Sequence, residues 1–355
     1  MNNFYKNKKV FITGHTGFKG GWLTEILSLW GADICGYSLP ADGEDNFFNA
    51  LNIEKKCKSI IADLRDEKAL QTALVNFAPD IIFHLAAQPI VRTSYEIPVE
   101  TFVVNTIGTA NLLQALRNVE KRCEAVLITT DKVYKNREDG SAYMEDDALG
   151  GYDPYSASKA AAEIVIESFM LSFFNPEQFE KHKKSIVSVR AGNVIGGGDW
   201  SKYRLLPDMM KAMNSGTPVV LRNPFSIRPW QHVLEPLYGY LLVGKKQYEN
   251  PFSVANSYNF GPNPEDVLTV EDVAKTGGIP YEIALDADAP HEAKLLQLDI
   301  SLAKNNLGWQ PHLSAKEAIE NTTAWYKAYY AHQDMEHFTK KQIEEYFDRS
   351  HGIRQ

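Results

Sequence analysis

Several features that would place this chain in a special class of protein are absent from its sequence. No apolar run is long enough to span a bilayer, and the polar, basic residues 1–9 are not followed by an apolar stretch of signal-peptide length. There are three cysteines, Cys35, Cys57 and Cys123, and none has CxxC spacing. Neither a disulfide framework nor a zinc site is therefore expected, and no metal is implied. We expect a cytoplasmic protein with no membrane partner.

An excess of positive charge is also lacking. The formal net charge of -8 argues against a protein that holds nucleic acid by neutralising its phosphates. Any site for an anion must therefore be local and built from a few basic side chains. The sequence contains no internal repeat or low-complexity tract, and 355 residues of ordinary composition predict a large globular protein with a real core.

Short β-rich runs alternate with amphipathic stretches through the first half of the chain. Parallel strands need crossover helices, and these connections are right-handed almost without exception. The pattern therefore predicts an α/β fold, a Rossmann-type doubly wound parallel sheet that helices cover on both faces. The predicted strands are residues 10–13, 34–37, 59–61, 81–84, 125–129 and 186–189.

After Arg190 the rhythm changes, which predicts a smaller α+β substrate domain interleaved with the first. A helix near 206–214 lies in this part, whereas a helix near 236–244 and a strand at 257–260 return the chain to the sheet. The predicted division is a Rossmann domain of residues 1–190 plus 230–262, a substrate domain of residues 191–229 plus 263–335, and a charged C-terminal tail of residues 336–355.

Three glycines at three-residue intervals, Gly14, Gly17 and Gly20, follow the first predicted strand and begin a helix. The first allows a tight turn, the second lets the backbone approach a pyrophosphate, and the third permits close helix–strand packing. The helix N-terminus adds positive potential. The pattern predicts dinucleotide binding, and the alternative is a glycine-rich turn without a ligand.

Residues after the other predicted strands agree with a dinucleotide. Asp63 is a candidate partner for an adenine amino group, and Ala86 and Ala87 are small enough to lie under a ribose or nicotinamide, unless they serve only close backbone packing. The second strand ends near Ser38, where such folds often carry a carboxylate for the ribose hydroxyls. No Arg follows to favour a 2′-phosphate, so the expected cofactor is NAD, held weakly at this ribose.

Tyr155 and Lys159 lie four residues apart in a segment that Asp153 can cap and Pro154 can begin, so both side chains share one helix face. A nearby ammonium favours the phenolate, and Tyr155 is therefore expected to accept a proton near neutral pH. An exposed Tyr–Lys pair is the alternative. Thr130, at the end of the fifth predicted strand, would hydrogen-bond the same substrate hydroxyl.

These motifs resemble the extended short-chain dehydrogenase/reductase family, and within it the nucleotide-sugar dehydratases that act on CDP-glucose. The resemblance covers about residues 8–330, in the segments TGHTGFKGGWL, FHLAAQPIVRTSYE, TTDKVYKNRE, GGYDPYSASKAAAE, RAGNVIGGGDW, RNPFSIRPWQHVLEPLYGYL and HEAKLLQLD. It implies a lyase that uses NAD to convert CDP-glucose to CDP-4-keto-6-deoxyglucose, in deoxysugar biosynthesis for the lipopolysaccharide O-antigen. The alternatives are a 4,6-dehydratase or 4-epimerase for another nucleotide sugar, and an inactive NAD-binding regulator.

The resemblance also suggests a role for the adjacent residues Thr130, Asp131 and Lys132. Dehydratases of this family place two acid/base groups directly after the strand-end hydroxyl, whereas an epimerase does not need them. Asp131 would be the general acid that protonates the C6 hydroxyl. Lys132 is the candidate base for the C5 proton, which requires a lowered pKa. The alternative is that these charges simply begin a solvated loop.

The resemblance implies further contacts with both ligands. The additional expected NAD contacts are Thr16, Phe18, Leu64, Gln88 and Asn105. Arg228 resembles the diphosphate contact of the family, since a guanidinium fork suits phosphate, although it could form a structural salt bridge instead. Trp200 could equally belong to the core. The expected substrate contacts are Gln88, Arg92, Asn193, Asp199, Trp200, Arg204, Arg222, Arg228, His291 and Glu292.

Two amphipathic segments, residues 99–116 and 154–169, resemble those that pair across a four-helix dimer interface in this family. We therefore expect a homodimer.

Overall fold

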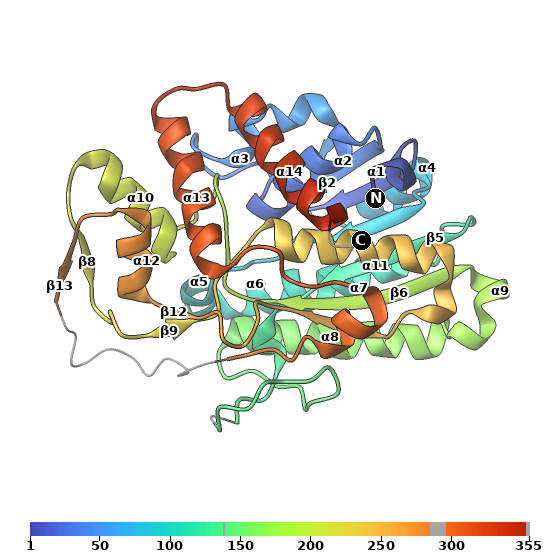
Figure 1. Cartoon of the computed structure of the whole chain (residues 1–355). Helices are drawn as coiled ribbons and strands as arrows, with labels where there is room; N and C mark the ends of the chain where they lie inside the picture. Colours follow the sequence, from blue (N-terminus) through green and yellow to red (C-terminus); the bar gives the residue numbers. More distant parts are fainter. Residues whose placement is uncertain (138, 285–295, 353–355) are drawn as a thin grey trace.

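A seven-stranded sheet lies at the centre of the computed structural model, which describes residues 1–137, 139–284 and 296–352 (Figure 1). The strand order is β11-β6-β5-β4-β1-β2-β3, and every neighbouring pair is parallel. From β1, the chain adds β2 and β3 on one side of the sheet and then β4, β5, β6 and β11 on the other side. This order confirms the predicted doubly wound, Rossmann-type sheet. The strands are β1 (Lys9–Thr13), β2 (Asp33–Ser38), β3 (Lys58–Ile61), β4 (Ile81–His84), β5 (Cys123–Ile128), β6 (Lys184–Ala191) and β11 (Ser257–Phe260).

Helices cover both faces of this sheet because alternate strand residues point to opposite sides. Val10 and Ile12 of β1 share a core with α2 (Phe18–Leu29) and α11 (Leu234–Glu249). Phe11, between them, packs in a second core with helices from the other side. Strands buried on both faces are continuously apolar, which explains why they could be found in the sequence. The helices of the second side are α4 (Glu67–Phe77), α7 (Gly108–Leu116) and α8 (Pro154–Phe173).

A smaller group of elements follows the end of β6, and Figure 1 shows α10 (Leu205–Ser215), α12 (Val270–Gly277) and one strand pair together on the left. Two of the three strand pairs in this group join segments on either side of β11, and the third joins two segments that precede it. The three two-stranded sheets pair β7 (Val194–Ile195) with β10 (Gln231–His232), β9 (Ile227–Arg228) with β12 (Leu268–Thr269), and β8 (Val219–Leu221) with β13 (Tyr281–Ile283).

The remaining helices are short or lie late in the chain. A π-helical turn at Val103–Ile107 connects α6 to α7, and another is formed by Ala303–Leu307. The α-helices are α1 (Asn2–Tyr5), α3 (Phe47–Ala50), α5 (Val91–Glu96), α6 (Pro98–Phe102), α9 (Phe179–His182), α13 (Ala315–Tyr330) and α14 (Met335–Gly352), and the 3₁₀ turns are Ile53–Lys56, Asp131–Val133, Pro176–Gln178 and Pro251–Ser253.

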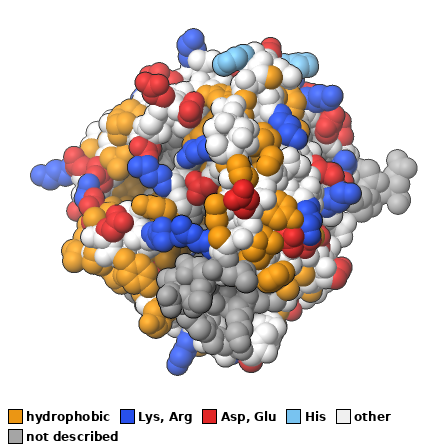
Figure 2. All heavy atoms as spheres, turned by 90° about the vertical axis from the view of Figure 1, so that its left-hand side faces the viewer, with side chains coloured by type: hydrophobic (Ala, Val, Ile, Leu, Met, Phe, Trp, Pro, Cys, Tyr) orange, Lys and Arg blue, Asp and Glu red, His pale blue; other side chains and the backbone are white. Residues whose placement is uncertain are grey.

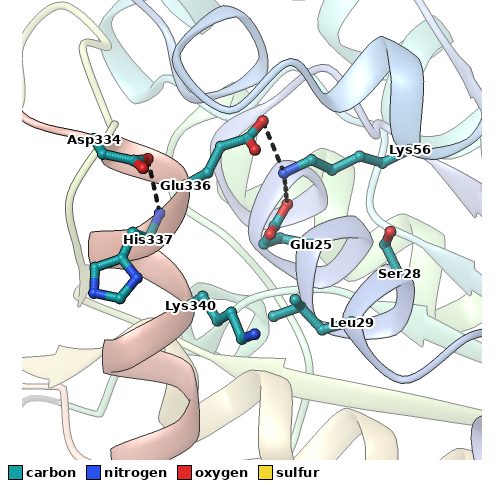
Figure 3. A pocket seen from close by; sticks show the side chains of 8 residues that line it. All are labelled: Glu25, Ser28, Leu29, Lys56, Asp334, Glu336, His337 and Lys340. Carbon is teal, nitrogen blue, oxygen red and sulfur yellow. Dashed lines mark hydrogen bonds and ion pairs between the residues drawn. The ribbon is translucent and has the colours of Figure 1, made fainter.

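The segment for which the sequence predicts a charged C-terminal tail forms the docked helix α14 in the structure. Tyr346 and Phe347 are buried in the same core as β1 and α2, and the rings of Trp30 and Phe347 are 4.8 Å apart. Ion pairs also connect α14 to α2, because Lys56 Nζ lies 2.6 Å from Glu25 of α2 and 3.5 Å from Glu336 of α14 (Figure 3). Most residues of this segment are charged or polar, but its few apolar residues hold the helix against the core.

The surface mixes charges of both signs. Basic and acidic side chains are interspersed on the face that Figure 2 shows. Within residues 1–137, 139–284 and 296–352, no helix has the length and apolarity needed to cross a membrane.

Candidate active site

The glycine loop between β1 and α2 is shaped by close backbone contacts. Gly14 has a φ of +80°, and a Cβ there would lie 2.8 Å from the amide nitrogen of Ala86. A Cβ on Gly20 would lie 2.0 Å from the carbonyl oxygen of Gly14. Gly17 caps α2, and the free N–H groups of this helix point toward the loop. The cradle that these glycines leave fits the pyrophosphate of a dinucleotide.

The adenosine end of such a cofactor would meet residues near the ends of β2 and β3. Thr16 is hydrogen-bonded to the hydroxyl of Ser38 at 2.8 Å and donates to the carbonyl of Leu39 at 2.9 Å. The loop itself therefore holds the hydroxyl that stands where related folds place a carboxylate. Asp63 forms an ion pair with Arg65 at 2.6 Å, and this pair lowers the pKa of the Asp63 carboxyl.

Asn105 connects the loop after β4 to the catalytic helix α8. Its side chain accepts a hydrogen bond from the backbone N–H of Gln88 at 2.8 Å and donates to Ser158 at 2.9 Å. The amide group of Gln88 is itself bonded to Thr101 at 2.9 Å and to the N–H of Ile90 at 2.6 Å. Both predicted ligand contacts thus also order this loop. Phe18 begins α2, Ala87 follows Ala86 after β4, and Leu64 packs on α7.

Thr130 and Asp131 lie directly after β5 and are buried. The Thr130 hydroxyl donates to Asp131 Oδ1 at 2.9 Å, and Lys132 Nζ lies 3.3 Å from the same oxygen. Gly192, beyond the end of β6, faces the carboxylate so closely that a Cβ there would lie 1.9 Å from it. The three polar residues are therefore brought together in a 3₁₀ turn, and a neighbouring glycine makes room for the carboxylate.

Tyr155 comes from the first turn of α8, where Asp153 caps the helix as the sequence predicts. Burial raises the pKa of Tyr155, while the neighbouring Thr130 side chain and the charge of Lys132 act to lower it. The hydroxyl and the phenol therefore face one substrate position.

Lys159 is placed differently from the expectation. Its ammonium donates to the carbonyl of Ile128 at 3.0 Å, and burial lowers its pKa to about 8, with Glu163 acting in the opposite direction. The groups that favour the phenolate of Tyr155 are Thr130, Lys132 and Arg204. Spacing alone placed the two residues on one face but could not give the direction of the long lysine side chain.

The pKa of Lys132 moves in the direction opposite to the one expected for a base. The charge of Asp131 raises the pKa of Lys132, against the effect of burial, and Tyr155 raises it further. A base for the C5 proton needs a neutral amine, which the sequence interpretation made conditional on a lowered pKa. The structure shows the opposite direction, because the carboxylate is the immediate neighbour of this ammonium.

The segment after β6 contributes a second ion pair beside the site. Arg204 lies 2.8 Å from the buried Asp199, and its guanidinium interacts electrostatically with Tyr155. Trp200 instead packs edge-on against Trp325 of α13, at 5.7 Å between ring centroids. From the sequence, Trp200 could be either a substrate contact or a core residue. This packing supports the core position.

The other predicted substrate residues are spread around this centre. Asn193 has a positive φ of 49°, Arg92 stacks on the ring of Tyr203 at 5.0 Å, and Arg222 is exposed beside β8. Arg228, on β9, acts on the pKa of Lys132. The predicted contacts His291 and Glu292 lie outside the described residues.

Two residues of the site are absent from the sequence prediction. Lys19 lies inside the glycine loop motif, and its charge interacts with Asp131, Lys132, Lys159 and Arg204. Gly192 is the close neighbour of the Asp131 carboxylate. The sequence signals that could have indicated these two residues are the position of the lysine between two functional glycines and the position of the glycine directly after a buried strand. In the described part of the chain, no cluster of His, Cys, Asp and Glu could hold a metal ion.

The comparisons with known proteins agree with this geometry. The sequence model of the family described as GDP-mannose 4,6 dehydratase matches residues 11–322. The chain belongs to this family. A curated relative from Salmonella typhimurium, CDP-glucose 4,6-dehydratase, is 44% identical over 349 residues. The alignment covers 97% of this chain and 97% of the relative. The predicted nucleotide-sugar dehydratase branch of the short-chain dehydrogenase/reductase family is thereby confirmed.

Solved structures of the wider group share the fold. The UDP-glucose 4-epimerase of Thermus thermophilus, in complex with NAD, is 26% identical, with a TM-score of 0.74 over 90% of this chain and 99% of that one. The UDP-glucose 4-epimerase of Stenotrophomonas maltophila gives a TM-score of 0.77 at 19% identity, over 91% of this chain and 99% of that one. The nucleotide-sugar dehydratase family thus shares its architecture with epimerases, so side chains must distinguish the two chemistries.

The glycine loop gives a test that needs no ligand. Gly20→Ala forces a Cβ against the Gly14 carbonyl, so we expect a loss of about 1–3 kcal/mol in the free energy of unfolding. Gly17→Ala is the matched control, because its Cβ would lie 3.4 Å from the nearest atom. Urea unfolding of both variants without cofactor measures the difference, and equal stability of the two variants would contradict the packing described here.

Proposed function

We propose that the protein is a lyase that dehydrates CDP-glucose to CDP-4-keto-6-deoxyglucose, with NAD as cofactor. The observation that carries this proposal is the Asp131–Lys132 pair, held directly beside Thr130 and Tyr155. An epimerase needs the hydroxyl and the phenol but no acid for a leaving hydroxyl. The 44% identity to a CDP-glucose 4,6-dehydratase supports the choice of substrate.

The residues of the cradle fit NAD. The glycine loop and the N-terminus of α2 would hold the pyrophosphate, Thr16 and Ser38 the adenosine ribose, and Ala86 the inner half of the cofactor. No basic residue follows β2 to receive a 2′-phosphate, which favours NAD over NADP. When bound, NAD would supply the acceptor for the C4 hydride and the donor that returns it to C6.

The side chains of the site supply the proton transfers. Tyr155, oriented by Thr130, removes the proton of the 4-hydroxyl as the ketone forms. The ketone acidifies the C5 proton, and a base removes it. Asp131, as general acid, protonates the C6 hydroxyl so that water leaves. Lys159, held on the Ile128 carbonyl, would position the ribose of the cofactor.

The nucleotide half of the substrate would lie against the residues that follow β6. Arg228 and Arg204 provide guanidinium groups near Lys132 and Tyr155 for the diphosphate and the sugar. Residues 191–229 and 263–335 would form this substrate domain, and residues 1–190 and 230–262 the NAD domain. The further proposed contacts are Gln88, Arg92, Asn193, Asp199, Trp200, Arg222, His291 and Glu292.

An exposed apolar surface supports a homodimer. Large apolar side chains are exposed on the paired helices α6–α8, among them Val99 at 76%, Ile107 at 51% and Ile164 at 58%. Monomeric proteins rarely expose such a patch, and a second copy of the same helices would complete a four-helix bundle.

Three free cysteines agree with a reducing compartment, and we place the enzyme in the cytoplasm, in deoxysugar biosynthesis for the O-antigen.

The proposed reaction is tested by product analysis. Pure protein is incubated with CDP-glucose, with and without added NAD, and mass spectrometry follows the nucleotide sugar. We expect loss of one water without net formation of reduced cofactor. Dehydration of a different nucleotide sugar would disprove the substrate, an isomer of unchanged mass would indicate an epimerase, and no reaction with any nucleotide sugar would remove the support for an enzyme.

Asp131→Asn tests the general acid. The amide keeps the size that Gly192 accommodates but has no acidic proton, so dehydration should slow by about 10²- to 10⁴-fold. Binding of CDP-glucose, measured by calorimetry, should change little. Full dehydration activity in this variant would exclude the assignment of Asp131.

Ile164→Glu tests the dimer. The wild-type protein should have twice the chain mass of 40.0 kDa in light scattering. A carboxylate buried at the bundle centre would be unpaired, so the variant should be monomeric. Phe252→Glu is the matched control, because Phe252 is 63% exposed but lies outside these helices. A monomeric wild-type protein would refute the proposed interface.

A further inference from the structure

A small cavity borders the carboxylate of Asp131, between the ends of β6, β10 and β11, and Gly192 and Gln231 also line it. It gives the centre of a water molecule about 10 Å³ in which to lie, which is enough for a single water. Thr130 and Lys132 contact Oδ1 of Asp131, whereas the space at Gly192 lies nearest to Oδ2. The Oδ2 atom is therefore the carboxylate oxygen on the side of the cavity.

Gln231 brings an unused hydrogen-bond acceptor to this cavity. The residue is 3% exposed, and its Nε2 donates to two backbone carbonyls, those of Gly192 and Phe260, each at 3.0 Å. Both protons of the amide are thereby used. Its Oε1 is buried and has no hydrogen-bond partner among the described residues. Buried polar atoms normally bond to protein or to an ordered water, and the cavity offers the place for such a water.

We propose that the cavity holds one water that returns a proton to Asp131 after each elimination, a role that rests on the proposed dehydration. A water between two acceptors donates one hydrogen bond to each of them. With Gln231 Oε1 on one side, the second O–H of this water points at the Asp131 carboxylate. Gln231 is then a positioning residue, because it acts on the acid through the water.

Asp131 needs such a path because its carboxylate is buried. The side chain is 2% exposed, yet each turnover consumes its proton and the next turnover needs it again. The lining of the cavity also includes Leu296 and Gln297, which are partly exposed. The cavity therefore connects the acid to a part of the protein that solvent reaches.

The proton transfers balance over one turnover. The C6–O bond breaks as the hydroxyl takes the proton of Asp131 and leaves as water. One O–H bond of the cavity water then breaks to protonate the carboxylate, and this water takes a proton from solvent in its place. Tyr155 releases to solvent the proton that it gained from the 4-hydroxyl, and the C5 base returns its proton to C5. No net proton is consumed.

Gly261→Ala tests the cavity without changing Gln231. Gly261 belongs to the lining, and its added Cβ would lie 3.7 Å from Leu298 and 3.8 Å from Ile300. These are ordinary van der Waals contacts, so the variant should fold while its methyl group takes the space of the water.

Gln231→Met tests the acceptor, because methionine has a similar length but no amide oxygen. Gln247→Met is the matched control. Gln247 is also buried, donates through Nε2 to Ser185 at 3.1 Å, and has an Oε1 without a hydrogen-bond partner in the described part of the chain. Ser185 lies at the start of β6, at the opposite end of this strand from Gly192.

A crystal structure of the wild-type protein tests the water site independently of activity. We expect one ordered water within hydrogen-bond distance of Gln231 Oε1 and Asp131 Oδ2. The same position should be empty of water in Gly261→Ala.

Rapid mixing with CDP-glucose and NAD separates the first turnover from the following ones. Asp131 carries its proton at the start, so the first dehydration in Gly261→Ala and Gln231→Met should proceed at the wild-type rate. Return of the proton should then limit the steady state, which we expect to be slower by about 10²-fold. Product should therefore appear as a burst of one molecule per active site. Gln247→Met should show wild-type rates in both phases.

Several results would overturn the inference. The absence of a water between Gln231 and Asp131 in the wild-type crystal would remove the site. Equal slowing of the first and later turnovers in Gly261→Ala would show that the cavity only positions the acid. Wild-type steady-state rates in both variants would exclude the proton path, and the same burst in Gln247→Met would assign it to a general loss of packing. Failure of the wild-type protein to dehydrate CDP-glucose would instead refute the proposed function.

Discussion

A buried ion pair between Glu163 and Arg190 fixes the catalytic helix to the sheet. Arg190 donates to both carboxylate oxygens, at 3.0 and 2.9 Å, and Ser188 donates to one of them at 2.8 Å. Thr129 donates to the other, directly before Thr130 in the chain. Removing one partner of such a pair typically costs about 3–5 kcal/mol. The distance between the strand-end hydroxyl and the tyrosine two turns earlier on α8 is therefore held by a rigid cluster.

The architecture was predictable because its signals are local. The predicted ranges match all seven strands to within two residues at each end, because most of these strands carry runs of buried apolar residues. Gly14 and Gly20 occupy positions where a side chain would collide with backbone, and Asp153 caps α8 as its sequence indicates. Gly20 and Asp153 meet requirements that near neighbours in the sequence impose, whereas a side chain at Gly14 would collide with the backbone of Ala86, in the loop after β4.

The parts that the sequence did not predict depend on contacts between distant segments. Lys159 reaches the backbone carbonyl of Ile128, 31 residues earlier in the chain, instead of the phenol. Trp200 packs on α13, more than a hundred residues later in the chain. The direction of a long side chain is set by what surrounds it, and spacing in the sequence does not contain this information. Lys19 was overlooked for the same reason.

The docking of α14 has a consequence for how the chain is made. Phe347 contacts Trp30, and its core also includes Val10 of the first strand. The first strand therefore lacks part of its final environment until the residues of α14 have left the ribosome. The N-terminal half, although it contains most of the sheet, emerges with an uncovered apolar face. During synthesis, this face is the surface that a chaperone would have to protect.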